Sequence, residues 1–254
     1  MTERGRDDDR SAKRLRADRL LVERGLFESR ARAQAAIEAG LVRAGGRVVA
    51  RASDMLATDA ALEAEEAFRW VSRGGLKLEA ALDAAGIDVT AREALDVGAS
   101  TGGFTEVLLA RGARRVHAVD VGRGQLHARL RGHPAVICLE ETDIRALAPG
   151  AIPAADIITI DVSFIGLAQV LPAAIAHAAP GAVLVALVKP QFEVGRNKLS
   201  KGGIVKDAAA RAGAIAAVAG CLAQLGWRTL HTLPSPIAGG DGNVESLIVA
   251  APAT

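Results

Sequence analysis

Short apolar runs alternate with segments of helical character from residue 94 to the end of the chain, and this alternation limits the possible folds most. Apolar runs bounded by turn residues predict buried strands, and the longer stretches between them predict helices. A strand–helix–strand order predicts βαβ units and a parallel sheet. We expect strands at 94–97, 115–119, 135–139, 156–160, 182–188, 227–233 and 246–250, with helices at 104–110, near 125–130, at 167–178 and at 206–225. The expected fold is therefore α/β, with a mostly parallel, seven-stranded sheet.

The N-terminal part of the chain is basic. Residues 10–51 hold 11 basic and four acidic side chains, whereas the net charge of the whole chain is only +2. Such a block is typical of a small module that binds a polyanion, although a solvated surface face would show the same charge run.

Turn and cap residues divide this basic part into a small α+β domain. The pattern predicts a helix over 15–22 that ends at Gly25, a helix over 30–39 that begins after Ser29, and a hairpin of 41–43 with 47–49. The expected organisation is a disordered tail at 1–12, an RNA-binding module at 13–59, an interdomain linker at 60–72 and the sheet domain at 73–254.

Composition excludes several classes of protein. The longest apolar run near a predicted strand, 182–188, is far shorter than the roughly 20 residues that a membrane-spanning helix needs. The polar N-terminal residues show no secretory signal, so we expect a cytoplasmic protein. Cys138 and Cys221 form no CxxC pair, so neither a disulfide framework nor a metal site is expected.

A glycine-rich turn follows the strand predicted at 94–97. Glycines at such a turn let the backbone approach a ligand and point N–H groups at it from the start of a helix. The spacing differs from the G-x-G-x-x-G pattern of dinucleotide sites and suits a nucleoside amino acid better. A tight strand-to-helix turn without a ligand is the alternative. The residues assigned to the ligand here are Asp96, Gly98, Ser100, Gly102, Gly103 and Phe104.

Two further aspartates follow the next two predicted strands. Asp120 lies about 20 residues after the glycine turn, where an acid can bind ribose hydroxyls. Asp143 follows the third strand, where a carboxylate could accept a hydrogen bond from an adenine amino group. Each aspartate alone is more often a cap or turn residue, but the set predicts a pocket for an adenosyl ligand.

The most specific set combines two lysines with two acids. Lys77 precedes the first predicted strand, Asp161 and Lys189 end the fourth and fifth, and Glu245 begins the last. The chain has six lysines against 25 arginines, so lysine is not its default cation. Unlike arginine, a lysine amine can lose its proton when its surroundings disfavour charge.

These four residues beside an adenosyl pocket suggest methyl transfer to a ribose hydroxyl. A hydroxyl is a weak nucleophile until a base takes its proton, and Lys189 is the candidate for that base. Asp161 would hold the amine in line. Methylation of base amino groups typically shows an Asn/Asp-Pro-Pro-Tyr/Phe turn, where this chain reads Asp161-Val-Ser-Phe.

Four segments carry a resemblance to a known family. The sequence RLLVERGLFESRARA at 19–33 resembles a small RNA-binding module that occurs in a ribosomal protein, in pseudouridine synthases and in tyrosyl-tRNA synthetases. The segments RWVSRGGLKL at 69–78, DVGASTGGFT at 96–105 and KPQFE at 189–193 are similar to the TlyA family, which is also labelled hemolysin A.

The resemblance implies a Rossmann-like, S-adenosylmethionine-dependent methyltransferase that modifies the 2′-hydroxyl of ribose in ribosomal RNA of one or both subunits, with cytidine as the nucleoside. Its catalytic domain would be like that of the FtsJ enzymes, whose Lys-Asp-Lys-Glu tetrad carries over onto Lys77, Asp161, Lys189 and Glu245. In the family, the segment around Trp70 links RNA contact to donor binding. We expect a monomer whose partner is the ribosome, without a metal or a membrane.

The resemblance also gives the basic residues a role. Arginines of the N-terminal module would bind phosphates and position the ribosomal RNA without reading its bases. The residues are Arg14, Arg16, Arg19, Arg30, Arg32 and Arg43.

Two other classes of function compete with this interpretation. One is a non-catalytic RNA-binding or ribosome-assembly factor with a decayed fold, which the intact four-residue set disfavours. The other is a membrane-active haemolysin, which the lack of a spanning segment or a long basic amphipathic helix disfavours.

Overall fold

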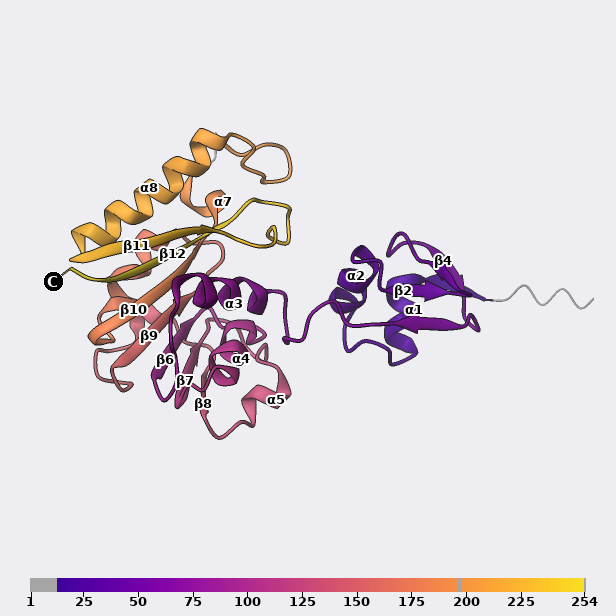
Figure 1. Ribbon diagram of the computed structural model, residues 1–254, viewed down its shortest axis with the longest axis horizontal. Coiled ribbons are helices and arrows are strands. Elements are labelled where there is room, and N and C mark those ends of the chain that lie inside the picture. The colour runs from indigo at the N-terminus through magenta and orange to yellow at the C-terminus, as the bar shows by residue number, and fades with distance from the viewer. Residues whose placement is uncertain (1–12, 196–197, 254) are drawn as a thin grey trace, which may run out of the picture. The chain divides into compact units, whose positions relative to one another are not determined.

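The computed structural model describes residues 13–195 and 198–253, and the expected tail at 1–12 lies outside them. The chain divides into two compact units between Arg69 and Trp70 (Figure 1). Each unit has a hydrophobic core of its own.

The N-terminal unit packs two helices on short strands. Its elements are β1 (Arg14–Arg16), α1 (Ala17–Glu23), α2 (Arg30–Glu38), β2 (Val42–Ala44), β3 (Arg47–Val48), β4 (Met55–Ala57) and β5 (Leu62–Ala64). Strand β1 pairs with β4, and β2 lies between β3 and β5. The core consists of small and medium apolar side chains from both helices and the strands, among them Leu21, Phe27, Ile37 and Val42.

Local signals located the helix α2 and the hairpin correctly. The hydroxyl of Ser29 accepts a hydrogen bond from the Arg32 N–H at 3.4 Å, as an N-cap residue does. Strands β2 and β3 form the expected antiparallel hairpin across Gly45 and Gly46.

Two expectations for this unit were wrong. Residues 14–16 form a strand, because the alternation of Arg14, Leu15 and Arg16 suits pairing with β4 better than a helix face. The expected linker at 60–72 is too long, because Leu62–Ala64 pairs with β2 inside the N-terminal unit.

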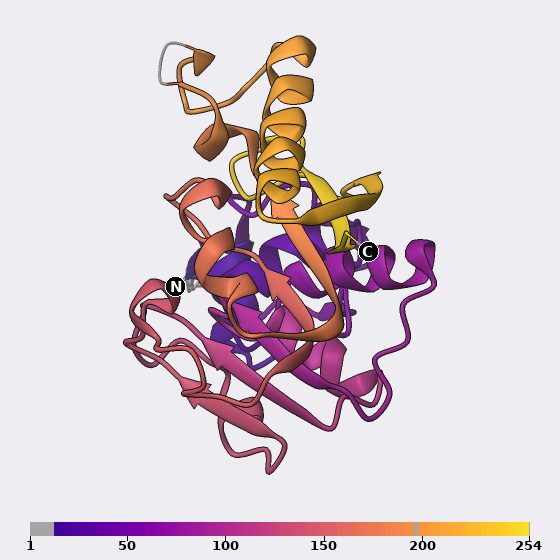
Figure 2. The ribbon, with the colours of Figure 1, turned by 90° about the vertical axis from the view of Figure 1, so that its left-hand side faces the viewer.

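The second unit is built on a seven-stranded sheet in the order β11-β12-β10-β9-β6-β7-β8. The strands are β6 (Glu93–Val97), β7 (Arg115–Val119), β8 (Val136–Leu139), β9 (Ala155–Ile160), β10 (Ala178–Val188), β11 (Trp227–Pro234) and β12 (Ser246–Pro252). Strands β6 to β10 are parallel, whereas β12 runs antiparallel to both β10 and β11. The strands fan out as a twisted sheet (Figure 2), and the expected fold class is confirmed.

Helices cover both faces of this sheet. They are α3 (Gly74–Ala85), α4 (Gly103–Ala110), α5 (Ala128–Arg131), α6 (Leu171–Ile175), α7 (Pro190–Glu193) and α8 (Ala208–Gln224), with 3₁₀ turns η1 (Ile144–Ala146) and η2 (Leu167–Gln169). Residues of α3 and α4 pack with Ile157 on one face, and residues of α6 and α8 pack with Ile158 on the other. Burial on both faces explains the long apolar runs of the central strands β9 and β10.

Three details of this unit differ from expectation. The helix expected over 167–178 is split into η2 and the short α6, and β10 begins four residues earlier than its apolar run, at Ala178. Helix α3, which no sequence pattern predicted, carries Lys77.

The chain order reverses at β6. From β6 the chain proceeds outward to β7 and β8, and then returns to β9 on the other side of β6. Such a reversal leaves a crevice beyond the carboxyl ends of the strands, where ligands of open α/β sheets bind. Among the described residues, no helix combines the length and apolar character of a membrane span, and none of the His, Cys, Asp and Glu side chains cluster as metal ligands.

Glycines allow α3 to pack tightly against its surroundings. A Cβ on Gly75 would lie 2.4 Å from Cγ of the buried Trp70, and a Cβ on Gly103 would lie 2.2 Å from Oγ of Ser72. Both distances are too short for non-bonded atoms. The start of α3 and the glycine turn after β6 therefore pack directly against each other, and glycine at positions 75 and 103 allows this close approach.

We predict that Gly75→Ala destabilises the protein by about 1–3 kcal/mol, because the Trp70 ring must move out of a packed core. Gly213→Ala is the matched control, since Gly213 lies within α8 with open space around its Cα, and alanine there should stabilise by about 0.5–1 kcal/mol. Urea unfolding of both variants measures the difference. Equal stability of the two would contradict the packing.

Candidate active site

Lys189 and Asp161 form an ion pair at the ends of neighbouring parallel strands. Asp161 follows β9 and Lys189 follows β10, and their Nζ and Oδ1 atoms are 2.7 Å apart. The ammonium also donates a hydrogen bond to Oγ of Ser163 at 2.9 Å. The backbone N–H of Asp161 donates to the Val97 carbonyl at 2.9 Å, so the strand ladder holds the pair in place.

Lys77 and Glu245 form a second, buried ion pair. Lys77 lies in α3 and Glu245 lies directly before β12, and their Nζ and Oε2 atoms are 2.5 Å apart. Both side chains are almost inaccessible to solvent. Removing one partner would leave an uncompensated charge in the interior, which typically costs about 3–5 kcal/mol.

The two ion pairs lie at the same edge of the sheet. Val188 pairs with Ser246 in the β10–β12 ladder, so Lys189, directly after β10, comes opposite Glu245, directly before β12. The start of α3 lies over the other pair, since a Cβ on Gly74 would be 3.7 Å from Oδ2 of Asp161. The structure thus brings the four residues to one end of the fold, as two pairs.

A cavity of about 590 Å³ opens beside Asp161, beyond the ends of β6, β7 and β9. Gly98, Ser100, Asp120 and Asp143 line it, as expected of ligand residues. Gly98 has a φ of +82°, and a Cβ there would be 2.7 Å from the Asp161 carbonyl oxygen. Glycine is therefore required where β6 and β9 approach each other.

The two outer aspartates are held by local hydrogen bonds. The carboxylate of Asp120 accepts from the backbone N–H groups of Ser100 at 2.8 Å and Gly122 at 2.7 Å, which fixes it at the cavity wall. Asp143 caps η1 and pairs with the Arg145 guanidinium at 2.6 Å, and this hydrogen bond lowers the pKa of its carboxyl group.

Asp96, Gly102, Gly103 and Phe104 do not line this cavity, contrary to expectation. The side chain of Asp96 points into the interior, because a strand directs alternate side chains to opposite faces. It accepts hydrogen bonds from Oγ1 of Thr105 at 2.7 Å and of Thr159 at 2.9 Å. Burial raises the pKa of Asp96 to about 6.

The glycine pair of the turn serves packing. A Cβ on Gly102 would lie 2.3 Å from Cδ1 of Leu130, and Gly103 contacts the start of α3. Phe104 belongs to the core formed by α3, α4 and the sheet.

Several of the predicted RNA-binding arginines are engaged within the N-terminal unit. Asp18 is buried and forms ion pairs with Arg16 at 3.1 Å and Arg30 at 2.7 Å, and the hydrogen bond from Arg16 lowers the pKa of this carboxyl group. The Arg32 side chain is only 11% exposed, pairs with Glu66 at 2.9 Å and lies over the ring of Phe68. A structural role therefore competes with phosphate binding at Arg32 above all.

Arg14, Arg19 and Arg43 remain exposed on this unit. Arg19 forms an exposed ion pair with Glu23 one helical turn away, which contributes little stability. Arg43 lies in the hairpin strand β2. These three are the better candidates for contact with a polyanion.

Trp70 is a core residue of the second unit and not part of an exposed linker. Its ring packs with Leu78 and Leu82 of α3, and its Nε1 donates a hydrogen bond to Glu79 at 3.1 Å.

The cavity wall also contains side chains that were not expected there, among them Phe164 and Gln125. Phe164 is 91% exposed at a φ of +66°, and its ring centroid lies 5.4 Å from that of Phe192. Gln125 lines the same cavity. An aromatic side chain three residues after Asp161, in a chain with few aromatics, was an available signal for Phe164, whereas nothing in the sequence marks Gln125.

Comparisons with known proteins agree with this architecture. A family model described as FtsJ-like methyltransferase matches residues 70–251, and one described as S4 domain matches residues 15–61. The 16S/23S rRNA (cytidine-2′-O)-methyltransferase TlyA of Mycobacterium tuberculosis is 48% identical over 92% of this chain and 88% of its own length. The chain belongs to the TlyA family of FtsJ-like methyltransferases. The TlyA family resemblance found in the motifs is thereby confirmed.

Other members and solved structures support the assignment to the TlyA family. Hemolysin A of Brachyspira hyodysenteriae is 37% identical over 92% of this chain and 98% of its own length. A structure from Streptococcus thermophilus, provisionally described as a hemolysin, has a TM-score of 0.76 at 37% identity and covers 95% of this chain and 89% of its own.

A more distant structure shows the fold alone. It comes from Listeria monocytogenes and is provisionally described as an S-adenosylmethionine-dependent methyltransferase, with a TM-score of 0.54 at 16% identity over 71% of this chain and 99% of its own. The fold of the second unit is thus that of methyltransferases, as expected.

We predict that the buried Asp96 gives stability a pH dependence that Asp96→Asn removes. The pKa of Asp96 is about 6 in the folded state, above the ordinary 3.8, so the native state binds this proton more tightly. Through this group the wild type gains stability as the pH falls from 7 towards 4, by about 1–3 kcal/mol relative to the variant. Urea unfolding at several pH values measures this, and parallel stability profiles would refute it.

Proposed function

We propose that the protein transfers a methyl group from S-adenosylmethionine to the ribose 2′-hydroxyl of cytidine in ribosomal RNA. The Lys189–Asp161 pair carries the proposal, because Asp161 lines the cavity where the methyl donor would lie and holds next to it an amine that can accept a proton after it has been deprotonated. The name of the M. tuberculosis relative supports the substrate and the modified position. A protein that acts on ribosomal RNA works where ribosomes are, so we infer that it acts in the cytoplasm. We also propose that the enzyme is monomeric.

The cavity fits an adenosyl donor. Its volume is in the range of small-molecule sites, and carboxylates that follow β7 and β8 provide acceptors for ribose hydroxyls and for an amino group. Asp120 would hold the ribose, Gly98 and Ser100 would lie along the amino acid portion, and Asp143 would lie near the adenine. When bound, S-adenosylmethionine supplies a methyl carbon on a sulfonium, which leaves as a neutral thioether.

Lys189 handles the proton of the attacking hydroxyl. Once the Lys189 ammonium has lost a proton to solvent, its amine would accept the proton of the attacking hydroxyl. The positive charge that Lys189 gains would replace the charge lost when the sulfonium becomes a neutral thioether. Asp161 and Ser163 hold the amine by contacts at 2.7 and 2.9 Å and so limit its orientations. Alignment of the hydroxyl with the methyl carbon then supplies a large part of the rate.

Lys77 and Glu245 complete the polar edge of the site. Because this pair is buried, water cannot solvate either charge if the two side chains separate, so both side chains stay in one geometry. Besides Lys189 and Asp161, this pair would place an ammonium and a carboxylate near the ribose hydroxyl. The exposed ring of Phe164 at the cavity offers a face on which a base can stack.

The N-terminal unit supplies affinity for RNA. Exposed arginines bind phosphates without reading sequence, and the affinity they provide falls as salt rises. Arg14, Arg19 and Arg43 are the candidates, with smaller contributions from Arg16 and Arg30, whose guanidinium groups already pair with Asp18.

We predict that Lys189→Ala lowers the rate of ribose methylation by about 10²–10⁴-fold, the usual contribution of a general base. Binding of S-adenosylmethionine, measured by calorimetry, should persist. Lys206→Ala, at an exposed lysine of the same unit, is the control and should stay within a few-fold of wild type. The assay maps 2′-O-methylation on ribosomal subunits that lack the modification. Equal methylation by wild type and Lys189→Ala would remove Lys189 from the mechanism.

We predict that charge reversal of the two exposed arginines in Arg14→Glu/Arg43→Glu weakens methylation at limiting subunit concentration. The loss should be largest at low salt and shrink as salt rises, because the contribution of the phosphate contacts itself falls with salt, and donor binding should be unchanged. Arg32→Glu should instead lower the stability of the N-terminal unit, since it places a carboxylate against Glu66. Unchanged methylation by the Arg14/Arg43 variant would reject the assigned RNA surface.

A further inference from the structure

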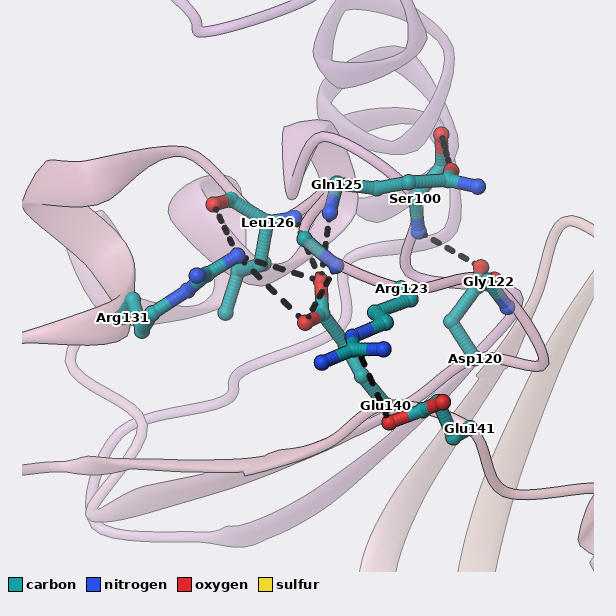
Figure 3. Close-up of polar contacts among 10 residues, drawn as sticks. Ser100, Asp120, Gly122, Arg123, Gln125, Leu126, Arg131, Glu140 and Glu141 are labelled. Carbon is teal, nitrogen blue, oxygen red and sulfur yellow. Dashed lines mark hydrogen bonds and ion pairs between the residues drawn. The ribbon is translucent and has the colours of Figure 1, made fainter.

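The side chain of Glu140 binds the backbone of a neighbouring loop (Figure 3). Glu140 directly follows β8, and its carboxylate accepts three backbone N–H groups: Gly124 at 2.8 Å, Gln125 at 2.6 Å and Leu126 at 2.8 Å. Three successive amides on one carboxylate fix the path of a loop that has no regular structure of its own.

Arg131 closes this arrangement from the other side. Its guanidinium donates to the Leu126 carbonyl at 3.2 Å and forms an ion pair with Glu140 at 3.3 Å. The Glu140 side chain is 16% exposed. The next residue, Glu141, is more exposed and less tightly bound than Glu140. Its side chain is 65% exposed, and its ion pair with Arg123 is long, at 3.8 Å.

The loop held by Glu140 forms one wall of the donor cavity. Oε1 of Gln125 accepts a hydrogen bond from Oγ of Ser100 at 3.1 Å, while the Ser100 backbone N–H donates to Asp120. The amide of Gln125 lies so close over Gly122 that a Cβ there would be 2.0 Å from Nε2. A continuous set of contacts therefore runs from Glu140, through the loop backbone and Gln125, to the glycine turn and Asp120.

We propose that Glu140 is a positioning residue for the methyl donor, which holds Gln125 and the loop over residues 122–126 at the wall of the adenosyl cavity. The inference rests on the proposed function, since it names the side of the site that faces the donor and not the RNA. Hydrogen bonds from the backbone, that of Leu126 above all, lower the pKa of Glu140, so its carboxylate is ionised at neutral pH.

The test replaces one atom. In Glu140→Gln an NH₂ group stands where a carboxylate oxygen accepts backbone N–H groups, so at least one of the three hydrogen bonds is lost. Glu141→Gln is the matched control, because it makes the same chemical change one residue away at an exposed side chain. Calorimetry with S-adenosylmethionine on the full chain should show about tenfold weaker binding for Glu140→Gln and wild-type binding for Glu141→Gln.

Two further readouts separate positioning from a general loss of structure. Methylation kinetics of Glu140→Gln should show a raised KM for the donor with kcat retained at saturating donor. Amide hydrogen exchange of the donor-free protein should accelerate at residues 124–126 and not in the central strands. Arg131→Met, which keeps the Glu140 carboxylate, should weaken donor binding by a smaller factor.

The outcomes are distinguishable. Equal donor affinity of Glu140→Gln and Glu141→Gln overturns the inference while wild-type methylation still supports the proposed function. A fall in kcat equal to the rise in KM, together with a loss of global stability, also overturns it, because the role is then structural. If the wild type binds no S-adenosylmethionine, the proposed function itself fails.

Discussion

The hydrogen-bond ladder between β6 and β9 determines where Asp161 lies relative to the cavity. Its last contact, from the Asp161 N–H to the Val97 carbonyl, ends both strands at the same level and brings Gly98 against Asp161. Because the chain reverses direction across this ladder, the donor cavity opens on one side of Asp161 and Lys189 lies on the other. Asp161 therefore borders both the cavity and Lys189, which in the proposed mechanism are the place of the methyl donor and the proton acceptor.

Several ionisable side chains of this enzyme are buried and hydrogen-bonded inside the protein. Asp96, Lys77 and Glu245 are buried near the carboxyl edge of the sheet, each with polar partners. Such groups contribute little net stability compared with apolar residues, and their concentration at one edge is typical of a functional site. In the N-terminal unit, Asp18 pairs with the guanidinium groups of Arg16 and Arg30. A count of charges alone would treat both groups as available for binding phosphate.

Much of this could be predicted from the sequence, and the errors have physical reasons. The central strands β9 and β10 carry long apolar runs because they are buried on both faces, so the ends of these runs, and with them Asp161 and Lys189, could be located from the sequence. The direction of a side chain within a strand could not be predicted. Asp96 was therefore assigned to the ligand, although its carboxylate binds Thr105 and Thr159. Contacts between a carboxylate and a distant loop backbone, as at Glu140, have no sequence pattern at all.

The burial of Trp70 has a consequence for dividing the chain. A catalytic fragment that starts at residue 73, where sequence composition suggests the boundary, would lack the indole that fills the space beside Gly75 and Leu78. The resulting void would expose apolar surface of α3 to water and favour aggregation of the fragment. Fragments meant to behave as independent enzymes should keep the aromatic residue as part of their first packed layer.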